Sequence, residues 1–258
     1  MRLYGKYVLM QLKAQMQYRA SFAFLLFGHF TMAFSALLSV YFMFTRFHAV
    51  EGFTFQEVLL CFATVVMSFS LTECFSRGFD TFATIIGNGE FDRIMVRPRS
   101  LIFQVLASKV EFTRLGRLVQ AALVLAYAIP TSGVAWTGEK VLTLILMIVS
   151  GYLVFTCLYV IYAALCFFST EGLEFINIFT DGGKEFGQYP LSIYGKRVLQ
   201  FFTFVVPLAL VQYYPFLTLI DRAPSPLLRW TPLLAILFVV PTYLIWRIGV
   251  RHFKSTGS

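Results

Sequence analysis

The residues of this chain that could do chemistry are concentrated in one short charged stretch between two apolar runs, residues 87–99. The stretch reads Gly-Asn-Gly-Glu-Phe-Asp-Arg-Ile-Met-Val-Arg-Pro-Arg. Its glycines give backbone freedom, the next residues favour a helix of one or two turns, and Pro98 moves Arg97 out of helical geometry. The pattern predicts a compact amphipathic knob on a membrane surface. With Phe91 among its charges it has the composition of a small binding epitope, and an ordinary charged loop is the alternative.

Catalytic patterns do not occur in the sequence. A phosphate-binding loop needs G-x-x-x-x-G-K-[ST], and the nearest approach, Gly138-Glu139-Lys140, does not meet it; HExxH and GxSxG are also missing. The four cysteines lie in apolar runs without the spacing of a zinc site or a disulfide framework. We therefore predict no catalytic site, no metal site and no cofactor in this chain.

Three ionisable residues lie at or near hydrocarbon depth, where such groups are often functional. Glu73 and Arg77 stand four residues apart and can pair on one face of a helix. We favour an interfacial ion pair that ends a span over a substrate-binding role for them. His29 lies inside the first apolar run, and we favour a packed or water-contacting histidine over a proton relay.

The composition places the chain in a membrane. Of 258 residues, 58% are hydrophobic and 13% are charged, whereas soluble domains carry about 25% charged residues; the mean hydropathy is +0.74. Every polar stretch is shorter than a domain, which needs roughly 50 residues, so residues 1–258 are predicted to form one membrane domain. The net charge of +8 is explained by membrane orientation and anionic lipid headgroups. No nucleic-acid partner is predicted.

Residues 1–19 are predicted to form an amphipathic helix on the membrane surface. Leu3, Tyr7, Met10 and Ala14 recur at helical spacing, while the basic residues of the segment lie largely elsewhere. A cleaved signal peptide is the alternative. We do not favour it, because the apolar run begins only near residue 20 and lacks a small-residue cleavage site.

Six apolar runs follow that we predict to cross about 30 Å of hydrocarbon as helices, which makes the fold an all-α integral membrane protein. They run approximately from Ala20 to Phe44, Val58 to Phe75, Leu115 to Ile129, Val141 to Phe168, Val198 to Ile220 and Thr231 to Trp246 or beyond. The fifth contains two prolines, which predicts a span followed by a re-entrant turn near residues 212–215. The polar segment 169–197 is predicted to lie outside the membrane.

The distribution of basic residues predicts the orientation. Six spans place both termini on one side, together with the knob and the segment 169–197. That side carries 17 Lys and Arg residues, and the three opposite loops carry 4. By the positive-inside rule, both termini and the knob are predicted to be cytoplasmic.

With these features the chain resembles a known family, the permease subunits of type-2 ATP-binding-cassette (ABC) exporters. More narrowly, it resembles their six-span bacterial subgroup. The likeness covers nearly the whole chain and depends on the order and spacing of several motifs. The residues that carry it are Gly89, Phe91, Asp92, Arg97 and Pro98, then Tyr189-Pro190-Leu191 with Ile193-Tyr194, then Pro207 and Tyr213-Tyr214-Pro215.

The resemblance implies a mechanism and a set of partners. Two permease subunits, identical or related, would pack with two ATPase subunits that bind ATP and Mg²⁺ and drive a cavity between inward- and outward-facing states. The short helix between spans two and three would be the coupling contact with the ATPase, in the plasma (inner) membrane of a bacterium. Carried over residue by residue, that contact comprises Gly89, Glu90, Phe91, Asp92, Arg93 and Arg97.

One departure and two alternatives accompany this interpretation. Type-2 permeases often have a re-entrant helical pair before the last span; here it is either built from the run around Tyr213 and Pro215 or reduced. A secondary transporter driven by an ion gradient would need intramembrane couplers, and transport that survives ATP depletion would favour it. A non-transporting membrane scaffold would co-purify with a partner without substrate-stimulated ATP hydrolysis.

Overall fold

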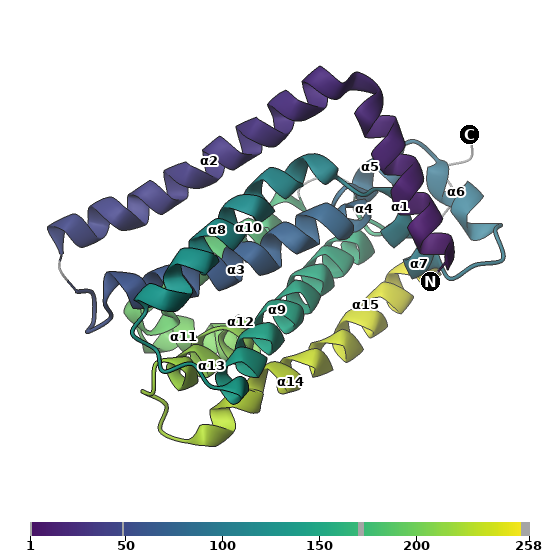
Figure 1. The fold of residues 1–258 in the computed structure, drawn as a ribbon. Helices are drawn as coiled ribbons and strands as arrows, with labels where there is room; N and C mark the ends of the chain where they lie inside the picture. Colours follow the sequence, from purple (N-terminus) through teal and green to yellow (C-terminus); the bar gives the residue numbers. More distant parts are fainter. Residues whose placement is uncertain (1, 48, 170–172, 254–258) are drawn as a thin grey trace.

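The computed structural model describes residues 2–47, 49–169 and 173–253, which form helices and short connections (Figure 1). The longer helices are α1 (Arg2–Gln15), α2 (Arg19–Arg46), α3 (Phe55–Phe75), α8 (Leu115–Thr131), α9 (Gly138–Leu165), α10 (Asn177–Gly187) and α15 (Val239–His252). The shorter helices are α4 (Arg77–Asp80), α5 (Phe82–Gly87), α6 (Glu90–Met95), α7 (Leu101–Ser108), α11 (Lys196–Phe204), α12 (Leu208–Val211), α13 (Tyr213–Leu219) and α14 (Thr231–Ala235). Turns of 3-10 helix are η1 (Met16–Tyr18), η2 (Phe112–Arg114), η3 (Leu173–Ile176), η4 (Leu191–Tyr194), η5 (Pro226–Trp230) and η6 (Ile236–Phe238).

Five helical stretches of the described chain are long and apolar enough to cross a membrane, and one bent pair of helices would make a sixth span. The five are Leu3–Arg46, Phe55–Phe75, Phe112–Thr131, Gly138–Leu165 and Pro226–His252. The prediction of an all-α integral membrane fold is confirmed. The predicted second, third and fourth spans each overlap one of these helices.

Helix α3 is the centre of the bundle and is buried between α8 and α9. It begins at a capping box: the Thr54 hydroxyl accepts from the Glu57 N–H, and the Glu57 carboxylate accepts from the Thr54 N–H. Further along, the hydroxyls of Ser68 and Thr72, four residues apart, each lie 3.2 Å from a carbonyl oxygen of α9. Small hydroxyl residues at this spacing allow two membrane helices to approach closely.

Helix α2 lies outermost and packs chiefly against α8. At the crossing, a Cβ atom on Gly116 of α8 would lie 2.0 Å from the carbonyl oxygen of Leu26, so only glycine fits there. The turn η1 separates α2 from α1, and α1 lies across the end of the bundle (Figure 1). This arrangement suits the predicted surface helix at residues 1–19.

The predicted extramembrane segment 169–197 enters the bundle instead, and residues 170–172 of it lie outside the described chain. Helix α10 packs beside α3: a Cβ atom on Gly187 would lie 3.2 Å from the Val65 side chain, at the middle of α3. The side-chain amide of Gln212 donates to the carbonyl oxygen of Gly187. The prediction was wrong because charged residues gather on one face of α10, while its glycines leave another face free for close packing.

The predicted fifth span is not one straight helix. Helix α11 is bent by 87° from the stretch α12–α13, which is the geometry of a broken span or a re-entrant loop. The break lies at Pro207, the residue before α12, rather than near residues 212–215 as predicted. Phe202 of α11 packs against Phe186 of α10 with 5.5 Å between ring centroids, so the bent element is anchored on α10.

The last span closes the bundle on the other side of α9. It continues from η5 through α14 and η6 into α15, so it begins before the predicted start at Thr231 and passes Trp246, as the prediction allowed, to end at His252. The end of α15 and the start of α1 lie at the same end of the bundle as α6 (Figure 1). We call this end the knob end and the opposite one the far end.

Candidate functional site

The predicted knob, residues 87–99, forms a short helix at the knob end of the bundle (Figure 1). Helix α6 is preceded by Gly89 with φ +66°, a left-handed conformation that glycine adopts without steric cost. After α6 the chain turns before α7 begins. The side-chain amide of Gln104 closes this turn by donating to the carbonyl oxygens of Ile94 at 3.0 Å and Arg99 at 3.1 Å.

Phe91 anchors the knob to the rest of the chain. Its side chain is fully buried, and its ring contacts Phe82, Phe167 and Phe253 with centroids 4.9–5.3 Å apart. Two of these rings follow the ends of α9 and α15, so segments far apart in sequence meet on Phe91. Inward packing of the aromatic face leaves the ring no accessible surface in this structure, and a contact between Phe91 and a partner stays a prediction.

The exposed part of the knob is its tip. Val96 is 83% exposed and Met95 is also exposed, and they lie between the exposed arginines Arg93 and Arg97. The sequence analysis missed Met95 and Val96 as surface residues. The available signal was the i, i+3 spacing of Phe91 and Ile94, which assigns the inward face to those two. Of the other predicted contact residues, Glu90 and Asp92 are half-buried.

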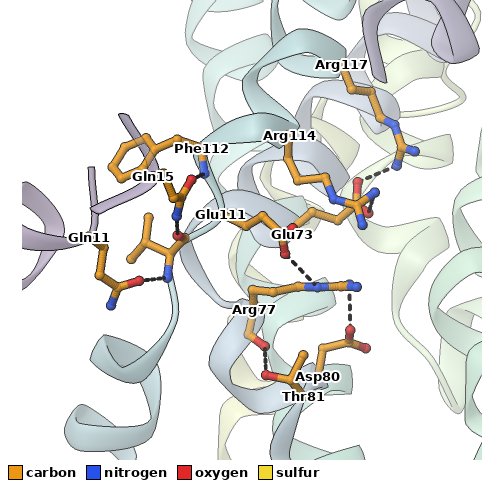
Figure 2. Close-up of polar contacts among 11 residues, drawn as sticks. Gln11, Gln15, Glu73, Arg77, Asp80, Thr81, Glu111, Phe112, Arg114 and Arg117 are labelled. Atoms are coloured by element: carbon orange, nitrogen blue, oxygen red, sulfur yellow. Dashed lines mark hydrogen bonds and ion pairs between the residues drawn. The ribbon is translucent and has the colours of Figure 1, made fainter. Parts of the chain in front are cut away.

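Glu73 is the centre of a charge network at the base of the knob (Figure 2). Its carboxylate, only 5% exposed, pairs with two arginines of the next span, Arg114 at 3.2 Å and Arg117. The predicted pair between Glu73 and Arg77 does not form. The reason is that α3 ends before Ser76, whose backbone (φ −116°, ψ 12°) leaves helical geometry, so the i, i+4 relation is lost.

Arg77 forms the second half of the network (Figure 2). It begins α4 and pairs with Asp80 at 2.5 Å and with Glu111 at 3.4 Å. Burial raises the pKa of Asp80 above its ordinary value, and the nearby Arg77 charge offsets this only in part. Together with the Glu73 pairs, these contacts connect α3, α4, η2 and α8. A movement of the short helices of the knob end therefore reaches the ends of two spans.

Two glutamines fasten α1 to the chain between α7 and α8 (Figure 2). The Gln11 side chain donates to the carbonyl of Ala107 at 2.8 Å and accepts from the N–H of Val110 at 2.6 Å. Gln15 repeats the pattern, donating to the Val110 carbonyl at 2.6 Å and accepting from the Phe112 N–H at 3.0 Å. The glutamines satisfy backbone groups where the helices are interrupted. Sequence analysis missed them, although their i, i+4 spacing places them on one face of α1.

His29 lies near this network but is not part of it. Its ring is close enough to Arg114 and Arg117 for electrostatic interaction, and its Nδ1 atom is buried with no hydrogen-bond partner in the described chain. The tight crossing at Gly116 holds α2 in place nearby. The structure thus places Glu73 and Arg77 in two neighbouring sets of ion pairs, which the chain at Glu111 and Arg114 connects, and leaves His29 beside them.

A second charged region, absent from the sequence-based predictions, lies on α10 at the depth of α3. The Lys184 ammonium is 2.8 Å from Glu185 and 3.9 Å from Asp181, and it lies 5.2 Å from the ring centroid of Phe69. The side chains of Asp181 and Glu185 are 61% and 57% exposed, whereas that of Lys184 is 14% exposed. We call these three residues the charged face of α10.

A bundle of spanning helices with ionisable groups at membrane depth and a firmly rooted helical knob at one end is the architecture of a multi-pass membrane transport subunit. Comparison with protein families agrees: the model described as ABC-2 family transporter protein matches residues 30–257. The chain therefore belongs to the ABC-2 transporter family and is a transmembrane subunit of an ABC transporter, as the resemblance in its motifs indicated. Neither a characterised protein nor a solved structure matches it.

Proposed function

We propose that this chain is the permease of an ATP-driven exporter and that a separate ATPase drives it through the knob. The observation that carries the proposal is the construction of the knob: an exposed tip at Met95 and Val96, and a buried root at Phe91. A surface that transmits force needs both an accessible contact and a rigid attachment. Membership of the ABC-2 family supports the presence of an ATPase partner.

The assembly contains two permeases, identical or related, and two ATPases that bind ATP and Mg²⁺. The exposed residues Arg93, Met95 and Val96 make the contact with the ATPase, and Glu90, Asp92 and Arg97 lie at its edge. Gly89 and Phe91 act indirectly, because the first sets the backbone entry to α6 and the second roots the helix.

Closure of the ATPases displaces the knob, and the displacement passes to the spans through the charge network. Arg77 and Glu111 connect the short helices to η2, and Glu73 connects the end of α3 to α8 through Arg117. The paired spans therefore move together, and the substrate cavity alternates between inward- and outward-facing states.

We place the knob end in the cytoplasm of a bacterial cell, with the chain in the inner membrane. The placement of α10 removes Lys184 from the loops that determine orientation, and Lys196 and Arg197 begin α11 of the bent element. The strong excess of Lys and Arg at the knob end remains without them. Cytoplasmic ATPases can reach the knob only in this orientation.

Replacing Val96 with aspartate tests the coupling contact. Tagged Val96→Asp protein, purified in mild detergent from its native cells, is expected to retain about 30-fold less ATPase than the wild type, because burying a carboxylate at an apolar contact typically costs about 2 kcal/mol. Its thermal midpoint should not change, since Val96 is exposed.

The matched control is Thr84→Asp, which adds the same charge at an exposed position of α5 outside the knob. Equal ATPase recovery from the wild type and Val96→Asp would contradict the assignment of the tip. If no ATPase is recovered from the wild type, and transport survives ATP depletion, the secondary-transporter alternative replaces the exporter.

The charged face of α10 forms part of the wall of the substrate route. Exposed carboxylates at hydrocarbon depth require water or protein around them, because contact with lipid tails is costly. Asp181 and Glu185 are exposed beside a spanning helix, and the Lys184 ammonium between them is held over Phe69. A water-filled route along this face satisfies these groups.

Cysteine labelling tests this placement without a transport assay. In membranes, Asp181→Cys is expected to react at least about tenfold faster with a membrane-impermeant thiosulfonate than Leu237→Cys, because reaction needs a hydrated thiolate. Leu237 is exposed on the last span, towards lipid in this interpretation, and the four native cysteines are buried, which keeps the background low. Equal and slow labelling at both positions would contradict a water-filled route at α10.

A further inference from the structure

A cavity of about 280 Å³ lies between α1 and α7, beside the turn that closes the knob. Leu3 and Tyr7 contribute from α1, Arg97 and Arg99 from the turn, and Phe103 from α7. The cavity thus combines two cationic side chains with an apolar and aromatic wall. The cavity adjoins the knob tip and shares Arg97 with its edge, whereas Met95 and Val96 do not line it.

The two arginines have no ion-pair partner in the part of the chain that the structure describes. A guanidinium is a planar set of donors that matches a phosphate group, and two of them at one cavity favour a bidentate anion. Gln104 also lines the cavity and holds the backbone of Arg99 at 3.1 Å. Gln104 also donates to the carbonyl oxygen of Ile94, so it holds the backbone of the turn that carries both arginines.

The apolar wall indicates that the anion is attached to a lipid. Leu3 and Tyr7 belong to the apolar stripe of α1, and Met10, the next residue of that stripe, is exposed. Since α1 lies across the end of the bundle (Figure 1), this stripe leads from the cavity along the membrane surface. The volume is just below the roughly 300 Å³ at which pockets hold drug-sized ligands, which suits a headgroup but not a whole lipid.

We propose that this cavity binds the phosphate headgroup of an anionic phospholipid, with the acyl chains along the stripe of Leu3, Tyr7 and Met10. Arg97 and Arg99 contact the phosphate, and Gln104 holds the backbone of their turn in place. A soluble anion would make no use of the apolar wall. The bound lipid bridges α1 and the knob turn, and so adds to the glutamine contacts that already connect α1 to the chain after α7.

The experiment uses the full-length protein and native mass spectrometry. Purified wild type, equilibrated with equal amounts of phosphatidylglycerol and phosphatidylcholine, is expected to retain phosphatidylglycerol preferentially. Arg97→Gln/Arg99→Gln is expected to retain about tenfold less of it, since hydrogen bonds to a charged group contribute about 1.5–3 kcal/mol. The matched control is Lys6→Gln/Lys109→Gln, which removes two exposed charges at the same end that do not line the cavity.

Three results would overturn the proposal. The first is equal retention of both lipids by the wild type, which decides the matter even if the arginine variant folds poorly. The second is an equal loss in the arginine variant and the lysine control, which would indicate diffuse attraction between charges. The third comes from wild type in phosphatidylcholine: if inorganic phosphate raises the thermal midpoint as much as phosphatidylglycerol does, the cavity is a site for free anions.

Discussion

Glu73→Ala is expected to lower the free energy of unfolding by about 3–5 kcal/mol, the usual cost of removing one partner from a buried ion pair. The variant leaves Arg114 and Arg117, both mostly buried at the start of one span, without their carboxylate. An unpaired buried cation is far more costly than the loss of a surface contact. Reversible unfolding by denaturant in detergent, followed by the fluorescence of the tryptophans, measures the change.

The matched control is Glu111→Ala. Glu111 is more exposed than Glu73 and pairs with Arg77 at 3.4 Å, and Arg77 keeps Asp80 when Glu111 is removed. The expected loss is about 1 kcal/mol or less, as for a partly exposed ion pair. Equal losses in the two variants would contradict a central role for Glu73.

A third variant separates the stability of the network from its role in coupling. Replacing Glu73, Arg114 and Arg117 together by leucine removes every charge of that group, and such replacements often recover or raise stability. The chain should then fold and bind its ATPase. If the proposed transmission is right, transport is still lost, because α3 and α8 no longer move together with the short helices of the knob end.

The network also shows what local sequence patterns can predict. That Glu73 and Arg77 end a span follows from their charge at the edge of an apolar run. Their partners do not follow, because they depend on the backbone turn at Ser76 and on the crossing of α3 with α8. The bundle itself was predictable from composition and periodicity, which are properties of each segment alone.

Helix α10 illustrates the opposite failure. Average polarity favours an exposed loop for this segment, yet Gly183 and Gly187 are four residues apart and pack against the core, while Asp181 and Glu185, also four apart, are exposed. The periodicity was therefore present, but averaging over the segment concealed it. The course of the chain through the bend at Pro207 depends on tertiary contacts that no local pattern contains.

The knob has some features that its local sequence predicts and others that depend on tertiary contacts. Its helix, its glycine entry and the proline after it were predicted from local residues and are present. The face of α6 that turns inward was not predicted, because Phe91 is covered by the rings of Phe167 and Phe253, which lie at distant points of the chain. The burial of Phe91 supports our proposal that it attaches the knob to the bundle, and this role can be measured.

Phe91→Ala is expected to destabilise the knob by about 3–5 kcal/mol, because it leaves a cavity among aromatic rings that cannot fully collapse. Amide hydrogen exchange of residues 90–95 should become much faster, since α6 loses its attachment. In Phe91→Leu, which fills most of the cavity, the change should be smaller. Val96→Asp should leave exchange at the wild-type rate, because the side chain at position 96 lies outside the packed cluster.

Both Phe91→Ala and Val96→Asp are expected to lose the ATPase, and hydrogen exchange distinguishes the reasons. In Val96→Asp, α6 stays folded and the ATPase is lost because its contact surface carries a new charge. In Phe91→Ala, α6 is unfolded, and the ATPase is lost because binding must restore the order of the helix. If Phe91→Ala loses the ATPase while exchange in α6 stays at the wild-type rate, the ring contacts the partner itself. That result would restore the interpretation from sequence alone and would require the cluster to open when the ATPase binds.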